Sequence, residues 1–356
     1  MRGHLISEIK KNNNFVMAAS PGLCERSINI LPTIVDSHTP IRIKRSSLNP
    51  IEDILTFFDL CKLIYKYKPD VVLAYTIKPI IWGGLASRIF NTKFNALITG
   101  LGYSFQGGSS LRKLLLFLVS NLYKAALKKS HSIMFQNAEN MMSFIEKSIV
   151  DKSKCHVVPG SGVDLDYYKF TQLPTSKDIV FLCIARLLNE KGVREYANAA
   201  KTVKLQYPKS KFLLLGDVDP SPDGVDISEV DSWVKSGSID YLGCANDVRG
   251  VIKNCHIFVL PSYHEGLPRS TIEAMSMGRA ILTTNAVGCK DTVINGINGF
   301  KVPTKDEKML AQKMIWFIDN SDLIKSMGIA SRRIAKEKFD VHKINTQMME
   351  IMGLNN

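Results

Sequence analysis

The sequence lacks any apolar run approaching the roughly 20 residues that a membrane-spanning helix needs. Its N-terminus also lacks the charged and then apolar pattern of a signal peptide, so we expect the chain to stay in the cytoplasm. The seven cysteines contain no Cys-x-x-Cys pair, and the seven histidines show no His-x-x-x-His spacing. These absences argue against disulfides and against a structural zinc site.

Motifs for nucleic-acid binding and for nicotinamide binding are also missing. The formal net charge is +13, which suits a nucleic acid, an anionic lipid or a diphosphate-bearing substrate, or else an evenly solvated basic surface. No helix-turn-helix, zinc-finger or RNA-binding pattern occurs, so we expect no nucleic acid partner. A nicotinamide oxidoreductase would need Gly-x-Gly-x-x-Gly, and Gly100-Leu101-Gly102 lacks both the third glycine and a prompt helix.

What is present is an alternation of short apolar runs and amphipathic stretches over 356 residues. This pattern predicts an α/β fold in which parallel sheets are covered by helices, and the length fits two domains of roughly 150–180 residues. Strands are expected at Phe15–Ser20, Asp70–Tyr75, Phe94–Thr99, Ser132–Gln136, Val157–Pro159, Ile179–Ala185, Lys211–Gly216, Ile239–Leu242, His256–Pro261 and Ala280–Thr284. Helices are expected between them, including Pro50–Tyr67, Pro79–Phe90, Leu111–Lys129 and Ala138–Lys147.

The aperiodic, polar segment Asp164–Asp178 is interpreted as a linker. We therefore expect two doubly wound, Rossmann-like lobes, residues 1–168 and 169–339, facing a central cleft. A last helix at Val341–Met352, within residues 340–356, is expected to cross back onto the first lobe. Since Met1–Ile6 leads directly into a helical pattern, the usual first strand of the N-terminal lobe is expected to be missing.

The densest functional signal is Pro261-Ser262-Tyr263-His264-Glu265-Gly266-Leu267-Pro268, followed by a helical pattern that contains Glu273. A buried strand ends at Pro261, and backbone N–H groups at the turn that follows can bind anions or sugar oxygens. Glu265 in the turn and Glu273 on the helix can grip hydroxyls at separate points of one extended ligand. The alternative is a pair of solvated glutamates beside an ordinary turn.

This motif resembles that of the retaining glycosyltransferases of the GT-B fold, family 4, in which two glutamates stand eight positions apart in a Glu-Gly-(Leu/Phe)-Pro context. The resemblance implies that Glu265 faces the transferred sugar and Glu273 holds the nucleotide ribose. It also implies that the backbone around Gly266, Leu267 and Pro268 contacts the sugar and the phosphates.

A second element, Ala185-Arg186-Leu187-Leu188-Asn189-Glu190-Lys191-Gly192, follows a buried strand. Arg186 and Lys191 can converge on one diphosphate and stabilise the charge that develops on a leaving group. The family has Arg and Lys at this spacing in that role. The family also places the backbone near Gly216 beside the donor, and the segment with Asn246 and Asp247 resembles the one that reads the base, although Asp247 is equally suited to a helix cap.

In the first lobe, motifs with Thr76, Lys78 and Gly100 follow two expected strands, where ligands of open α/β sheets bind. Together with Ser161 they resemble a narrower bacterial subgroup that builds O-antigen, capsule and N-glycan precursors on polyprenyl diphosphate. That subgroup includes the bacillosaminyl-diphospho-undecaprenol α-1,3-N-acetylgalactosaminyltransferases. The sequence departs from many family members in having no histidine near Thr99-Gly100.

The stretch Leu111–Lys129 has an apolar centre flanked by Arg112, Lys113, Lys124, Lys128 and Lys129. This composition suits a helix lying in an anionic membrane interface. A helix buried in the lobe with basic ends is the alternative.

These signals predict an enzyme that moves a hexose or N-acetylhexosamine from a UDP-sugar to a polyprenyl-diphosphate-linked saccharide, with retention. By the same resemblance, the protein is expected to be peripheral on the inner face of the plasma membrane. Because Arg186 and Lys191 can replace a metal, we expect neither a metal nor another cofactor. The alternative is a catalytically degenerate, nucleotide-binding protein of the same fold.

Overall fold

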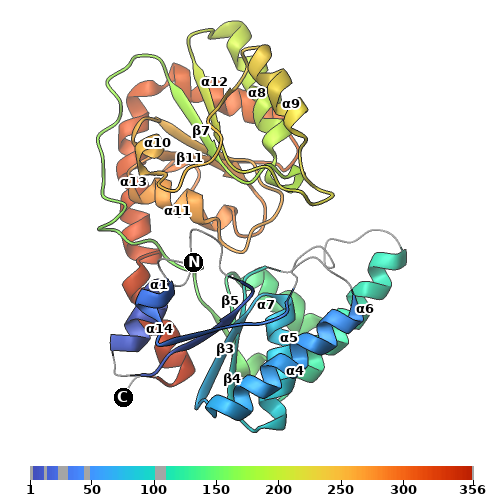
Figure 1. Ribbon diagram of the computed structural model, residues 1–356. Coiled ribbons are helices and arrows are strands. Elements are labelled where there is room, and N and C mark those ends of the chain that lie inside the picture. Colours follow the sequence, from blue (N-terminus) through green and yellow to red (C-terminus); the bar gives the residue numbers. More distant parts are fainter. Residues whose placement is uncertain (1–2, 12–13, 23–30, 44–48, 101–109, 355–356) are drawn as a thin grey trace. The chain divides into compact units, whose positions relative to one another are not determined.

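Figure 1 shows the computed structural model of the chain, which describes residues 3–11, 14–22, 31–43, 49–100 and 110–354. The chain divides into two compact units. The first comprises residues 1–161 and 342–356, and the second comprises residues 162–341. Each unit contains a parallel β-sheet with helices packed on it.

The main sheet of the first unit has four parallel strands in the order β3-β4-β5-β6. Strands and helices alternate along the chain as α4 (Pro50–Tyr67), β3 (Val71–Tyr75), α5 (Ile77–Ile89), β4 (Lys93–Ile98), α6 (Ser110–Leu127), β5 (Ser132–Phe135), α7 (Ala138–Glu146) and β6 (Cys155–Val157). A separate parallel pair is formed by β1 (Met17–Ser20) and β2 (Ser37–Pro40), and the short helices of this region are α1 (Gly3–Lys11) and α3 (Leu31–Ile34).

Side chains alternate between two apolar clusters on the two faces of this sheet. Phe94, Ala96 and Ile98 of β4 lie in one cluster with residues of α5, α6 and α7, whereas Leu97 lies in the other. The second cluster is completed by Leu5 of α1 and by four residues of α14 (Val341–Met352): Ile344, Met348, Met349 and Met352. The last helix of the chain therefore covers one face of the first sheet.

The sheet of the second unit has six parallel strands in the order β12-β11-β10-β7-β8-β9. Its strands are β7 (Val180–Ile184), β8 (Lys211–Leu215), β9 (Asp240–Tyr241), β10 (Ile257–Leu260), β11 (Ala280–Thr284) and β12 (Gly299–Val302). Its helices are α8 (Val193–Gln206), α9 (Ile227–Lys235), α10 (Arg249–Lys253), α11 (Arg269–Ser276), α12 (Glu307–Asp319) and α13 (Ile324–Lys338). This is the strand order of a doubly wound dinucleotide-type fold.

Both faces of the second sheet are buried. Phe181 and Phe212 stack with ring centroids 5.0 Å apart in the cluster that includes residues of α8 and α12. Leu182 and Phe258 lie in the cluster on the other face, with residues of α10, α11 and α13. Burial on both faces explains why the central strands β7, β8 and β10 are nearly continuous apolar runs.

Most of these elements are where the sequence pattern predicts them. The bounds of α4, α14 and β11 agree with the expected ranges, but β6 ends at Val157, where the expected strand begins. The strand expected at Phe15–Ser20 is β1, which is only partly buried because it belongs to a two-stranded sheet. Two strands, β2 and β12, escape the pattern because both have four residues and neither is an apolar run.

Candidate active site

The strand order of the second unit reverses between β7 and β10, which are neighbours in the sheet. The loop that follows β7 carries Arg186 and Lys191, and the turn that follows β10 carries Glu265. Ligands of open parallel sheets bind outside the carboxyl ends of the strands at such a reversal. The fold thus brings the two densest sequence motifs to the position where a ligand is expected.

The turn that carries Glu265 is fixed by its backbone. The Glu265 N–H donates to the Val287 carbonyl at 3.0 Å, and α11 begins directly after Pro268, as predicted. Gly288 has φ +77°, and a Cβ atom there would lie 2.4 Å from the Glu265 carbonyl oxygen. Only glycine fits at this position, because both the backbone conformation and the space exclude a side chain.

Glu265 is paired with Lys191. Its Oε1 lies 2.7 Å from Lys191 Nζ and accepts a hydrogen bond from Ser262 Oγ at 3.0 Å. The Lys191 side chain is only 14% exposed. Burial acts to lower the pKa of Lys191, but the negative charge and hydrogen bond of Glu265 outweigh it and raise the pKa. Lys191 therefore stays positively charged at neutral pH.

The loop before α8 is packed tightly against the Glu265 turn. Gly192 has φ +69°, and a Cβ atom there would lie 2.1 Å from the Pro261 carbonyl oxygen. The Tyr263 N–H donates to the Glu190 carbonyl at 2.8 Å. These contacts fix the backbone that carries Lys191 relative to the turn that carries Glu265.

Arg186, the other cation of this loop, is held by a different carboxylate. Its Nη1 donates to Asp219 Oδ2 at 2.5 Å, and the Arg186 side chain is 58% exposed. The pKa of Asp219 is lowered, first by hydrogen bonds from Ser221 and further by Arg186. The Arg186 side chain is thus largely exposed to solvent, and its guanidinium is oriented by the Asp219 carboxylate.

Glu273 lies in the first two turns of α11 and is nearly buried, with a side-chain exposure of 9%. Its Oε1 accepts a hydrogen bond from Arg269 Nε at 2.8 Å. Burial raises the pKa of Glu273, although Arg269 and the Tyr168 hydroxyl act in the opposite direction. The alternative of two solvated glutamates is therefore wrong for this pair.

Three other residues that the sequence singles out lie along the same sheet edge. Gly216 follows β8, and a Cβ atom there would lie 1.7 Å from the Ala185 carbonyl oxygen at the end of β7. Asn246 is exposed in the loop after β9. The Asp247 carboxylate accepts from the Arg249 backbone N–H at 3.0 Å and from the Arg249 guanidinium, whereas the residue at the N-cap of α10 is Val248.

The residues expected in the first lobe all belong to the first unit. Thr76 precedes α5 with φ +70°, and Lys78 Nζ lies 2.7 Å from Asp53 Oδ1 in a mostly buried ion pair. Gly100 follows β4, and Ser161 is the last residue of the unit before α14. The rest of the Gly100 motif, residues 101–105, lies outside the described residues.

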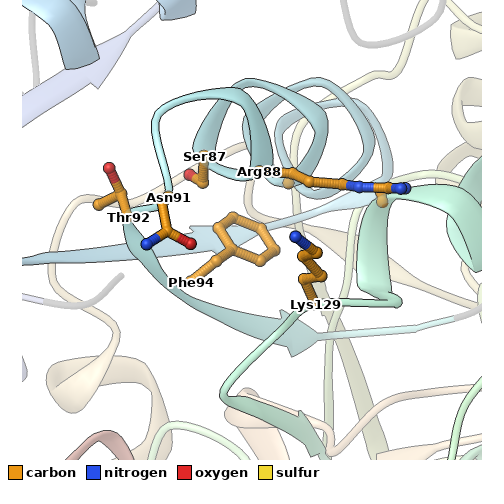
Figure 2. A pocket seen from close by; sticks show the side chains of 8 residues that line it. Ser87, Arg88, Asn91, Thr92, Phe94 and Lys129 are labelled. Carbon is orange, nitrogen blue, oxygen red and sulfur yellow. The ribbon is translucent and has the colours of Figure 1, made fainter.

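A small cavity of about 30 Å³ lies in the first unit between the ends of α5 and α6 and the start of β4 (Figure 2). Ser87, Arg88, Asn91, Thr92, Phe94 and Lys129 are among its lining residues. It lies at the amino end of the strands, whereas Thr76 and Gly100 follow their carboxyl ends. The cavity is therefore separate from the expected ligand-binding edge.

The sequence contains two Asp-x-Asp triplets, Asp164-Leu165-Asp166 and Asp217-Val218-Asp219, which the prediction of a metal-free site does not consider. Asp164 accepts from the backbone N–H groups of Asp166 and Tyr167, and Asp219 is bound by Arg186. Within the described residues, no group of three His, Cys, Asp or Glu side chains is placed to hold a metal ion. Among the described residues, no helix is long and apolar enough to span a bilayer.

The site therefore combines two kinds of group. Two cations, Arg186 and Lys191, flank the strand reversal, where they can stabilise a diphosphate. Glu265 is bonded to Lys191, and the nearly buried Glu273 lies on the helix that follows the Glu265 turn. The site also includes three residues that were not predicted from the sequence: Ser262, Asp219 and Tyr168. Ser262 is close in the chain to its partner Glu265, whereas Asp219 and Tyr168 are distant in the chain from their partners, Arg186 and Glu273.

Family models agree with this geometry. Residues 178–320 match the model of "Glycosyl transferases group 1", and residues 4–137 match that of "Glycosyl transferase 4-like". Among solved structures, the Anabaena protein HepE in complex with UDP and glucose matches with a TM-score of 0.80 at 17% identity, covering 99% of this chain and 95% of that one. A glycosyltransferase from Rickettsia africae matches with a TM-score of 0.78 at 21% identity, covering 98% and 93%.

Curated relatives cover most of the chain. The N,N'-diacetylbacillosaminyl-diphospho-undecaprenol α-1,3-N-acetylgalactosaminyltransferase of Campylobacter jejuni is 30% identical over 78% of this chain and 76% of its own length. An Escherichia coli UDP-Gal:α-D-GlcNAc-diphosphoundecaprenol α-1,3-galactosyltransferase is 28% identical over 78% and 73%. The chain thus belongs to the family of group 1, family 4-like glycosyltransferases of the GT-B fold.

Proposed function

We propose that this glycosyltransferase moves a hexose or N-acetylhexosamine from a UDP-sugar to a polyprenyl-diphosphate-linked saccharide in bacterial surface-polysaccharide or glycan biosynthesis. The observation that carries the proposal is the Lys191–Glu265 pair beside Arg186 at the strand reversal of the second sheet. The names of the Campylobacter and Escherichia coli relatives support this acceptor class, and the name of the latter also supports the UDP-linked donor.

In the proposed reaction, the bond between the anomeric carbon and the β-phosphate oxygen breaks, and its electron pair leaves with the phosphate. Arg186 and Lys191 stabilise the negative charge that develops there. An acceptor hydroxyl bonds to the anomeric carbon on the same face, and its proton passes to the leaving phosphate. Glu265 orients the sugar and Glu273 holds the ribose. Because the acceptor attacks the face from which the phosphate leaves, the configuration is retained. Because the phosphate takes the proton, no side-chain base is needed.

The proposal includes independence from metals and other cofactors, because two cations already flank the expected diphosphate. We expect turnover in EDTA to match turnover with added Mg²⁺ or Mn²⁺. A loss of activity in EDTA that one of these ions restores would refute this part of the proposal.

A peripheral contact with an anionic membrane, on the cytoplasmic face, is part of the same proposal, since the acceptor is attached to a lipid. Leu114, Phe117 and Leu118 of α6 are exposed, with Phe117 at 65%. On α4 a second apolar stripe is exposed at Ile51, Ile54, Phe58 and Tyr65. Both helices pack against α5 (Figure 1) and carry exposed lysines, including Lys62, Lys113 and Lys124.

The membrane contact is tested by sedimentation with vesicles of phosphatidylcholine alone or with added phosphatidylglycerol. We expect binding that depends on phosphatidylglycerol and falls roughly tenfold or more in the double variant Leu114→Ser/Phe117→Ser, since each side chain loses apolar burial. The control is Leu205→Ser, which changes an exposed leucine on α8 of the second unit. Equal binding by the double variant and the wild type would exclude α6 from the contact.

The main test is turnover of a panel of UDP- and GDP-sugars with polyprenyl-diphosphate acceptors. We expect one UDP-sugar to be used, with loss of activity in Glu265→Ala and Lys191→Ala but not in Lys201→Ala, which changes an exposed lysine on α8. The anomeric coupling of the product in proton NMR tests retention. UDP binding without turnover of any donor would instead favour the degenerate, nucleotide-binding alternative.

A further inference from the structure

The loop after β8, residues 217–225, runs along the loop that carries the two cations. The Leu187 N–H donates to the Asp217 carbonyl, and the Val225 N–H donates to the Leu187 carbonyl, both at 2.9 Å. Asp223 accepts from two successive N–H groups, those of Asn189 and Glu190. The 217–225 loop is therefore bonded to the cation-bearing loop along most of its length.

Within this contact, Asp219 is the residue that reaches the Arg186 side chain. Its carboxylate is 12% exposed, and Oδ1 accepts from the Ser221 backbone N–H at 3.0 Å while Oδ2 accepts from Arg186 Nη1. Gly224 packs beside it, since a Cβ atom there would lie 2.1 Å from the Asp219 carbonyl oxygen. The carboxylate is thus held by the backbone at Oδ1 and bound to the exposed Arg186 side chain at Oδ2.

Arg186 needs such a partner more than Lys191 does. Lys191 is nearly buried and bonded to Glu265, whereas Arg186 is more than half exposed and has a long side chain with much rotamer freedom. A guanidinium has five N–H donors, and the bond to Asp219 uses one N–H of Nη1. Among the described residues the remaining donors make no hydrogen bond, so they can meet a diphosphate, and the carboxylate limits the directions in which they point.

We propose that Asp219 is a positioning residue for donor binding: it holds the Arg186 guanidinium in the orientation that receives the diphosphate. The inference rests on the proposed function, because it assumes that Arg186 binds the diphosphate of a UDP-sugar. On this basis, each cation of the loop is oriented by one carboxylate from a neighbouring loop, Lys191 by Glu265 and Arg186 by Asp219. Asp219 acts through Arg186 and does not itself touch the donor.

The test is a double-mutant cycle on UDP affinity, measured by isothermal titration calorimetry with the full chain. Arg186→Ala is expected to weaken UDP binding roughly tenfold or more, as for the loss of a charge-assisted hydrogen bond. Asp219→Asn should weaken it roughly threefold to tenfold in the wild type, because the neutral amide binds the guanidinium less well. In the Arg186→Ala background, Asp219→Asn should have no further effect.

The control is Asp223→Asn, which changes the other aspartate that supports the cation-bearing loop. Asp223 bonds only to backbone groups of that loop in the described contacts, so its effect on UDP binding should be the same with and without Arg186. Unfolding temperatures of all variants separate loss of loop structure from loss of orientation.

Each outcome decides one claim. If Asp219→Asn leaves UDP affinity unchanged, or weakens it equally in the Arg186→Ala background, Asp219 does not act through Arg186 and the inference is overturned alone. If the wild-type chain does not bind UDP, the proposed function is overturned and the inference falls with it. Coupling between Asp219 and Arg186, with none between Asp223 and Arg186, supports the inference.

Discussion

At the residue scale, the position of Glu265 depends on a glycine that does not belong to the Glu motif. Gly288 has φ +77°, and there is no room for a Cβ atom beside the Glu265 carbonyl. Gly296 has nearly the same φ, +76°, but open space around its Cα. These two glycines separate the effect of backbone strain from the effect of a steric clash.

We predict that Gly288→Ala lowers the free energy of unfolding by about 3 kcal/mol and removes most transferase activity, since the clash displaces the turn that carries Glu265. Gly296→Ala should cost only about 1 kcal/mol, from backbone strain, and should leave activity near the wild-type level. Urea unfolding and turnover measure the two effects. Equal losses of stability in both variants would show that the turn yields to the added methyl group.

Glu273 gives a prediction about pH. Burial raises the pKa of its carboxyl above the ordinary value of 4.5, so the folded state binds this proton more tightly than the unfolded state. Its contribution to stability is therefore greatest at low pH and decreases as the pH rises through the raised pKa. We predict that Glu273→Gln has a higher unfolding temperature than the wild type at pH 7 and that this advantage shrinks towards pH 4.

The same substitution should weaken UDP binding, because the proposed function gives Glu273 the ribose hydroxyls. Thermal unfolding between pH 4 and pH 8, with and without UDP, measures both effects. If the Glu273→Gln unfolding temperature differs from that of the wild type by the same amount at every pH, ionisation of Glu273 carries no cost.

The sequence alone could predict the parts of this site that are local. Glu265 and Glu273 belong to one turn and one helix, so their spacing is readable, and Arg186 and Lys191 share one loop. The pairing of these residues is not readable, since Lys191 and Glu265 are 74 positions apart and Arg186 and Asp219 are 33 apart. Such contacts follow from the strand order, which brings the ends of β7, β8 and β10 together.

At the scale of elements, the irregular segment Asp164–Asp178 is held by two arginines of the second unit, Arg332 on α13 and Arg279 directly before β11. Arg332 of α13 donates to the Tyr168 carbonyl at 3.0 Å and to the Leu165 carbonyl at 3.2 Å. Arg279 is buried and donates to the carbonyls of Thr171 and Gln172, both at 3.2 Å. The expected linker is thus hydrogen-bonded to arginines of the second unit, and its polar composition does not reveal these contacts.

We predict that Arg332→Ala increases the rate of trypsin cleavage after the exposed Lys169 about tenfold, because the segment loses charge-assisted hydrogen bonds to two carbonyls. Mass spectrometry of the fragments identifies the site. The matched control is Arg333→Ala, the exposed neighbour on the same helix, which should leave the rate unchanged. Similar rates in the two variants would mean that other contacts suffice to hold the segment.

At the scale of the whole molecule, the chain leaves the first unit at residue 161 and returns to it at residue 342. Its last helix supplies Met348 and Met352, both fully buried, to the core of the first unit. The amphipathic pattern of α14 predicts a helix with an apolar face, but the pattern cannot say which sheet that face covers. Stability of the first unit therefore depends on residues at the far end of the sequence.

This arrangement predicts different responses of the two units in calorimetry. Met348→Ala should destabilise the first unit by about 2–5 kcal/mol, because it leaves a cavity against Leu97 and Met134. UDP should instead raise the unfolding temperature of the second unit, which holds Arg186, Lys191 and Glu265. Met142→Ala, at a 43% exposed methionine of α7, is the control in the first unit. If Met348→Ala lowers the transition that UDP raises, the two units unfold as one cooperative structure, and the last helix stabilises both.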